Sequence, residues 1–100
     1  MESRIQTVCA TIVAAEQPQA ILLYGCKRSP INETLREISL CLIVEKDAKD
    51  IEYRLYRTLE TDFAVNLLVY TVADWNRLRA DATSYAAGIR QKGVLLYGKA

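Results

Sequence analysis

The sequence predicts an α/β (α+β) domain built on a small, three- to four-stranded mixed sheet with flanking helices. Segments with an apolar residue at every third or fourth position, typical of amphipathic helices, alternate with segments of two-residue periodicity, typical of strands. Such an order indicates helices packed on a sheet. The 100 residues suffice for one core, and we find no linker, repeat or low-complexity tract, so we expect a single domain over residues 1–100.

The first expected elements are a helix and a strand. Five apolar residues follow the spacing of one helix face, and Pro18 marks where the helix should have ended: Ile5, Val8, Cys9, Ile12 and Val13. Residues 20–24 then form a short apolar run, which is typical of a strand covered on both faces. This strand would deliver Gly25 and Cys26 at its C-terminal end.

The next segment is expected to be a loop, followed by a clearer strand. Residues 27–36 carry polar and turn-forming side chains and predict a loop with a short helical turn. Residues 37–44 alternate as a strand does. One face would carry Ile38, Leu40, Leu42 and Val44, and the other Glu37, Ser39, Cys41 and Ile43.

Three more helices and one more clear strand follow. Asp47 is a plausible N-cap for a helix with apolar residues 48, 51, 55 and 59 on one face. Residues 63–70 alternate as a strand. Thr71 and Asp74 have the spacing of a capping-box variant, which opens a helix through about residue 79. A last helix over residues 84–92 ends before Gly93, and residues 94–97 form a short strand or an extended tail.

Composition excludes several function classes. The formal net charge is +1, so no strong nucleic-acid or membrane field is expected. Histidine is absent, which removes the commonest general base and a common zinc ligand. The three cysteines are widely spaced and are expected to be reduced thiols. The N-terminus lacks the apolar core of a signal peptide, and no apolar run approaches the roughly 18 residues of a membrane span, so we expect a cytoplasmic protein without membrane contact.

Four ordered motifs carry a resemblance to a known family. They are Leu-Tyr-Gly-Cys at residues 23–26 with two cations after it, Glu-Ile-Ser-Leu at 37–40, Val-Asn-Leu-Leu-Val-Tyr-Thr at 65–71, and Ile-Arg-Gln-Lys-Gly-Val-Leu-Leu-Tyr at 89–97. This set resembles the minimal nucleotidyltransferases, a branch of the DNA polymerase beta superfamily. Family members typically read Leu-Phe-Gly-Ser and Asp-Ile-Asp-Leu at the first two motifs, with a third aspartate opening the next strand. The resemblance implies a nucleotidyltransferase-like fold.

The resemblance also implies a degenerate site. Glu37, Ser39 and Asn66 would occupy the three metal-binding positions and supply one negative charge where the family has three. Neutral Ser and Asn oxygens are weak ligands for Mg²⁺, so we expect no metal and assign no catalytic residue. The loop that binds nucleotide in the family would survive only as a vestige, at Gly25, Cys26, Lys27 and Arg28.

The leading functional interpretation is therefore a catalytically degenerate nucleotidyltransferase-fold protein, a pseudoenzyme that acts by binding. Its partner would be a protein or a nucleotide that undergoes no chemistry. Because minimal nucleotidyltransferases often pair with small all-helical HEPN proteins in toxin-antitoxin modules, the resemblance implies a HEPN-type partner, and an exposed sheet edge leaves a homodimer open.

Two alternatives remain. One is an active, Mg²⁺-dependent nucleotidyltransferase with an atypical site anchored by Glu37. The other treats Cys26 as a reactive thiol, because Lys27 and Arg28 follow it and a helix could start nearby. No histidine is available as its base, so an inert thiol is favoured.

Overall fold

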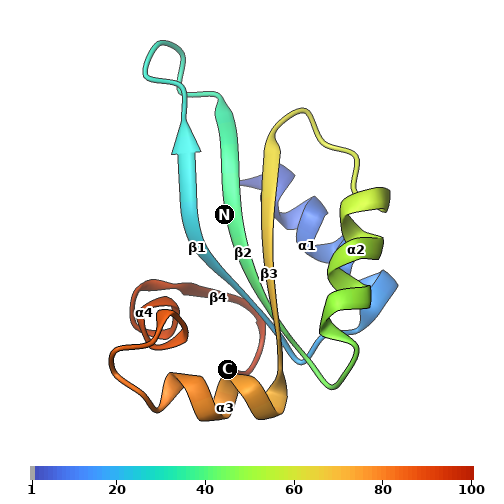
Figure 1. Cartoon of the computed structure of the whole chain (residues 1–100). Helices are drawn as coiled ribbons and strands as arrows, with labels where there is room; N and C mark the ends of the chain where they lie inside the picture. Colours follow the sequence, from blue (N-terminus) through green and yellow to red (C-terminus); the bar gives the residue numbers. More distant parts are fainter. Residues whose placement is uncertain (1) are drawn as a thin grey trace.

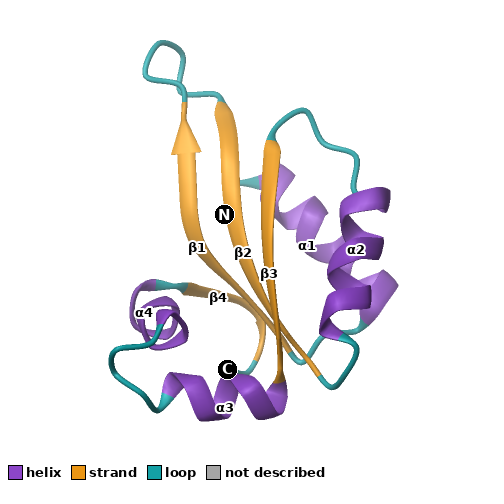
Figure 2. Cartoon of the chain, viewed as in Figure 1, coloured by secondary structure: helices purple, strands orange, loops and turns teal. Residues whose placement is uncertain are grey.

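Residues 2–100 of this chain, described by a computed structural model, form a four-stranded sheet flanked by four helices (Figures 1 and 2). No helix in this part of the chain is long and apolar enough to cross a membrane. The elements follow one another as α1 (Ser3–Glu16), β1 (Ala20–Arg28), β2 (Leu35–Val44), α2 (Ala48–Thr58), β3 (Ala64–Thr71), α3 (Val72–Arg79), α4 (Tyr85–Lys92) and β4 (Val94–Gly98).

The sheet is mixed, as predicted, and its strand order is β3-β2-β1-β4. β1 and β2 form an antiparallel hairpin, and β4 pairs with β1 antiparallel. β2 and β3 run parallel, and α2 makes the crossover that a parallel pair requires. β2 is therefore an inner strand, paired along both edges.

Each face of the sheet has its own apolar core. The alternation predicted for β2 is confirmed, because Ile38, Leu40, Leu42 and Val44 pack in the core that contains residues of α1 and α2. Cys41 and Ile43, on the opposite face, pack with Trp75 of α3 and with Ala86 and Ile89 of α4. Figure 2 shows α3 and α4 beside one end of the sheet only. This partial cover leaves the other end of that face open.

The expected loop over residues 27–36 is shorter than predicted. Lys27 and Arg28 continue β1, and Leu35 and Arg36 already belong to β2. The connection is a turn over residues 29–34 and contains no helix. Strand pairing continues with polar side chains on the face that α3 and α4 leave open, and on the other face Leu35, the partner of Arg28, is still buried in the core. Polarity alone therefore gave too long a loop.

One of the two predicted N-caps, Thr71, is confirmed, and the structure adds a cap at Ser84 that was not predicted. The backbone N–H of Asp74 donates to the Thr71 hydroxyl at 3.1 Å, and that of Ala87 donates to the Ser84 hydroxyl at 3.0 Å. Asp47 does stand at the N-cap position of α2, but its side chain makes no cap hydrogen bond. Its backbone has a left-handed φ of 61°, a conformation that Asp tolerates better than most residues, and this replaces the expected capping geometry.

The outer edge of β3 is closed by one side chain of α2. Tyr56 accepts a hydrogen bond from the backbone N–H of Leu67 at 2.7 Å, and its hydroxyl lies 3.4 Å from the Leu67 carbonyl, to which it donates. Edge strands expose such groups to pairing with another chain. Tyr56 therefore satisfies backbone groups that the sheet leaves unpaired.

We predict that Tyr56→Phe lowers the free energy of unfolding by about 1 kcal/mol, the net value of a typical hydrogen bond. Urea denaturation followed by circular dichroism would measure it. Tyr53→Phe is the matched control, because Tyr53 lies on the same helix, is 65% exposed and makes no side-chain hydrogen bond within residues 2–100. Equal stability of the two variants would contradict the proposed closure.

The core under α3 and α4 contains a thiol and a phenol that titrate late. Burial raises the pKa of Cys41 from its ordinary value of 9.0 to about 12. Burial is also the main reason that the pKa of Tyr24 rises from 10.0 to about 12. Both groups are neutral in the folded protein at neutral pH.

We predict that stability falls as the pH rises above 9. In the unfolded chain Cys41 loses its proton near pH 9, whereas the folded chain holds it to about pH 12, so the unfolded state gains stability over that window. The loss for Cys41 is on the order of 2 kcal/mol by pH 11. Urea titrations at several pH values would show this slope, and Cys41→Ala should reduce it to the part that Tyr24 contributes above pH 10. An unchanged slope in that variant would contradict the assignment.

Candidate functional site

The open part of the α3/α4 face carries a group of polar residues, which we call the polar shelf: Gly25, Lys27, Glu37, Ser39 and Asn66. The shelf lies on three adjacent strands, β1, β2 and β3. Its residues on β2 and β3 lie on the same sheet face as Cys41 and Leu68. Those two residues are covered by α3 and α4. The shelf begins where the cover by these short helices ends.

The strand register brings the three predicted metal positions together. Ser39 of β2 stands directly beside Asn66 of β3 in the parallel pair, and Glu37 stands beside Ala64. The Asn66 side-chain amide donates to the Ser39 hydroxyl at 3.5 Å, a long hydrogen bond. Glu37 and Ser39 point to the same face, as the two-residue period requires.

A bulge in β1 places Gly25 and Lys27 on this face. The pairing with β2 shifts between Leu23 and Gly25, so that Tyr24 is the extra residue. Beyond it Gly25 pairs with Ser39, and Lys27 pairs with Glu37. A side chain at Gly25 would press on Ser39, because a Cβ atom at that position would lie 3.1 Å from both the Cβ and the Oγ of Ser39. Gly25 thus makes room for Ser39 within a strand, whereas the sequence placed it at the strand end.

The single carboxylate of the shelf is paired with a cation of the same protein. Lys27 Nζ lies 3.4 Å from Glu37 Oε2, with side chains that are 76% and 32% exposed. Such an exposed pair contributes little to stability. Its effect is electrostatic: the one charge that could attract a metal ion is neutralised by Lys27.

Arg36 is the shelf neighbour that the sequence analysis missed. With Lys27, Arg28, Glu37 and Ala64 it lines an open cavity of about 620 Å³ at the shelf. Its position in β2 depends on how far the hairpin extends, and the expected loop over residues 27–36 concealed it. The cavity lining holds three cationic side chains and one carboxylate, so its net charge is positive.

Alternation along β1 places Cys26 and Arg28 on the opposite face from Gly25 and Lys27, although the Arg28 side chain also lines the cavity at the shelf. Cys26 pairs with Ile38, whose side chain faces α1 and α2, so the exposed thiol belongs to that side. It lies within a strand and not at the start of a helix. Arg28 donates to the Glu33 carbonyl at 3.2 Å and lies 3.6 Å from a Glu2 carboxylate oxygen. The four residues therefore do not form one loop.

Glu2 joins the hairpin to α1. The backbone N–H of Arg4 donates to its carboxylate at 2.9 Å, which is the main reason that the pKa of Glu2 lies below its usual range. The Arg4 guanidinium lies above the Phe63 ring, 5.5 Å from its centroid, and 3.5 Å from an Asp62 carboxylate oxygen. These contacts bind Arg28 and Asp62 into a structural network.

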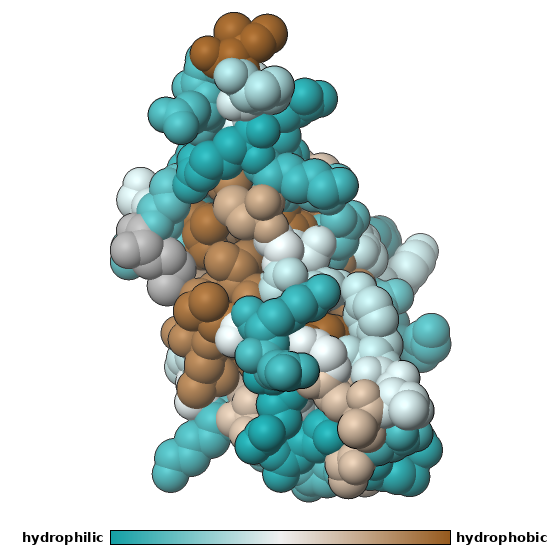
Figure 3. Space-filling view, turned by 90° about the vertical axis from the view of Figure 1, so that its left-hand side faces the viewer, coloured by the Kyte–Doolittle hydropathy of each residue, from teal (hydrophilic) through white to brown (hydrophobic). Residues whose placement is uncertain are grey.

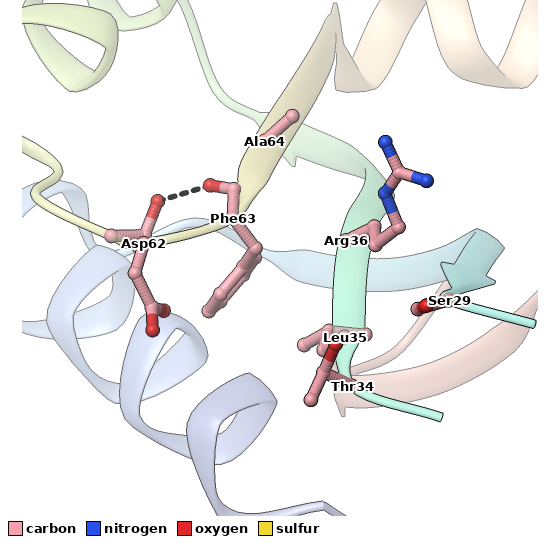
Figure 4. Close-up of a pocket in the computed structure, with 8 residues that line it drawn as sticks. Ser29, Thr34, Leu35, Arg36, Asp62, Phe63 and Ala64 are labelled. Carbon is pink, nitrogen blue, oxygen red and sulfur yellow. Dashed lines mark hydrogen bonds between the residues drawn. The ribbon is translucent and has the colours of Figure 1, made fainter. Parts of the chain in front are cut away.

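A second cavity, of about 600 Å³, lies at the turn end of the hairpin, beside the start of β3 (Figure 4). Phe63 lies between Asp62 on one side and Arg36 on the other, and the dashed line marks the hydrogen bond from the Thr61 hydroxyl to the Phe63 carbonyl. Arg36 lines both cavities. Leu35 and Phe63 give this cavity apolar walls, and it holds no set of groups that points to catalysis.

The residues present do not fit a two-metal centre. No group of three His, Cys, Asp or Glu side chains within residues 2–100 is arranged to hold a metal ion. Comparisons of this chain with protein-family models, with curated proteins and with solved structures found no match. The fold and the site therefore define a small α+β domain with a polar shelf beside a cavity whose lining carries a positive net charge.

We predict that Ser39→Asp with Asn66→Asp creates a metal site. The two new carboxylates and Glu37 would project side by side from adjacent strands, and Mn²⁺ and Mg²⁺ prefer such oxygen ligands. Calorimetric titration should show Mn²⁺ binding to the double variant and none to the wild type. The control adds Glu37→Gln to the double variant and should weaken binding. No gain of binding would mean that these positions do not converge as described.

Proposed function

We propose that this protein is a catalytically degenerate relative of the minimal nucleotidyltransferases that acts by binding. One observation carries the proposal. The positions that resemble the family's three metal ligands lie side by side on an open sheet face, yet they hold a lysine-paired glutamate, a serine and an asparagine. This arrangement keeps the geometry of a site without its charge.

The side-chain charges around the cavity at the shelf favour the binding of an anion. Nucleotidyl transfer by two metals needs carboxylates to hold the cations between the attacking and leaving oxygens. Here Lys27 and Arg36 outnumber Glu37 around the cavity, and the Ser39 hydroxyl and the Asn66 amide are neutral donors. Phosphate oxygens would match these groups. Any nucleotide that binds here would do so without metal and without chemistry.

Calorimetric titration of ATP and GTP tests this function. Each nucleotide is added with Mg²⁺, with Mn²⁺ and with chelator. We predict that any binding is equal with metal and with chelator, and that Lys27→Met weakens it, because the ammonium group is lost. Thr7→Val, an exposed change on α1, is the control.

Transfer assays give the opposing outcome. The protein is incubated with nucleoside triphosphates, divalent metal and candidate acceptors. Transfer of a nucleoside monophosphate at a rate abolished by Glu37→Ala would overturn the proposal. Metal-dependent binding that disappears in the same variant would also count against it.

The alternative is an active nucleotidyltransferase with an atypical site anchored by Glu37. The position of Glu37 on the shelf, beside Ser39 and across from Lys27, is the observation in its favour. If it holds, Mn²⁺ should support activity better than Mg²⁺, since Mn²⁺ binds such sites more tightly. The loss of charge argues against it, because phosphoryl-type transfer depends on positioned charge.

A protein partner is the other half of the proposal. The family resemblance points to a small helical HEPN-type protein, as in toxin-antitoxin modules, and a second copy of this chain is the competing partner. Co-purification with a HEPN protein encoded nearby, compared with the mass of the protein alone in solution, distinguishes the two.

A further inference from the structure

The outer edge of β4 is an open sheet edge surrounded by apolar side chains. β4 is the last strand of the order β3-β2-β1-β4 and pairs only with β1. Val94, Leu95 and Tyr97 are 59%, 47% and 40% exposed. Figure 3, which views the molecule from this side, shows apolar side chains gathered beside polar ones. An open edge offers backbone N–H and C=O groups to another strand.

An uncharged groove runs between β4 and α1. Its volume is about 450 Å³, and it is lined by Gln6, Cys9, Ala10, Val13, Ala14, Leu96 and Tyr97. Side chains of an added strand would point alternately to the two faces of the sheet. Those on the α1 face would enter this groove, so apolar residues are favoured at alternate positions of the added strand.

Cations flank the same edge. Between residues 82 and 100 the chain has Arg90, Lys92 and Lys99 and no acidic side chain. All three are exposed, and none forms an ion pair with any other residue of the described chain, 2–100. Lys92 comes two residues before β4 and Lys99 directly follows it. The edge thus has an apolar centre with a positive charge at each end.

At the opposite edge of the sheet, formed by β3, a side chain occupies backbone hydrogen-bonding groups. There the Tyr56 hydroxyl bonds the backbone of Leu67 and closes β3. β4 has no side chain in this role among the hydrogen bonds of residues 2–100. The two edges of the sheet therefore differ in whether a side chain of the same protein occupies their backbone hydrogen-bonding groups.

We propose that the β4 edge binds an extended segment of a partner protein, apolar at alternate positions and with Asp or Glu at its ends, which adds as a fifth strand. Such strand addition takes affinity from main-chain hydrogen bonds and specificity from side-chain pockets and charges. The inference rests on the proposed function, in which the protein acts by binding, and names the partner's chemistry. A second copy fits less well, because antiparallel two-fold pairing of β4 would bring Lys92 of each copy near Lys99 of the other.

The test is selection of a randomised nonapeptide display library on the full-length protein. Five residues of β4 span about 17 Å, so nine residues cover the strand and both flanking cations. We expect enriched peptides to alternate apolar residues and to end in Asp or Glu. The synthesised peptides should bind the Lys92→Glu/Lys99→Glu variant about tenfold more weakly. The same variant, used for selection, should enrich peptides with Lys or Arg ends.

Lys46→Glu/Lys49→Glu is the matched control, since it changes the net charge equally at exposed positions near α2. It should bind the selected peptides as the wild type does. Peptide binding should also slow backbone hydrogen exchange in Val94–Gly98.

Four outcomes would overturn the proposal. They are no enrichment, enrichment without acidic ends, equal binding to the charge-reversed variant, and exchange protection confined to other residues. A concentration-dependent dimer protected at β4 would assign the edge to a second copy instead. Because nucleotide titration probes the polar shelf, a negative peptide result with an unchanged titration removes this edge only and leaves the shelf proposal standing.

Discussion

The structure depends on the burial of β2 between two strands and, for half of its length, between two helical layers. Ile38, Leu40, Cys41, Leu42 and Ile43 have no exposed surface. Two helices of eight residues, each about 12 Å long, cover one face only as far as Cys41. Glu37 and Ser39 continue the same row beyond this cover. One strand therefore supplies both the core and the polar shelf, and the length of α3 and α4 sets the boundary between them.

A single extra residue in β1 decides which side chains reach that shelf. Because strand side chains alternate, a shift of one residue exchanges the two faces. The bulge at Tyr24 makes that exchange within the sheet: Lys27 meets Glu37, and Arg28 turns toward Glu2 at the start of α1. The bulged Tyr24 itself packs under α4, with its ring perpendicular to that of Tyr85 at 6.1 Å. The register shift at Tyr24 therefore has two effects: it packs Tyr24 against α4, and it places Lys27 beside Glu37 on the shelf.

Much of the fold could be predicted from the sequence, because strands and helices repeat their apolar residues at fixed periods. The two faces of β2 are an example, and the cap at Thr71 followed from its spacing to Asp74. The length of the hairpin could not, since Lys27, Arg28 and Arg36 are polar residues within strands, and a polar run favours a loop. The shared face of Glu37 and Ser39 followed from the two-residue period, whereas their convergence with Asn66 followed from the family resemblance. The pairing of Lys27 with Glu37 depends on the bulge before Gly25; a glycine can mark a bulge, but an apolar run that ends at Gly25 equally predicts the end of a strand.

The charges of the polar shelf are balanced without a bound metal ion. Three adjacent carboxylates on one sheet face would repel one another and raise each other's pKa unless a metal ion neutralised them. Here an amide-to-hydroxyl hydrogen bond joins Asn66 to Ser39, and Lys27 balances Glu37. A lysine held on the neighbouring strand thus supplies the positive charge that a cluster of carboxylates would need from a metal ion. With these residues the shelf is a hydrogen-bonded, charge-balanced surface beside a cationic cavity, and this is the basis for proposing that it acts by binding.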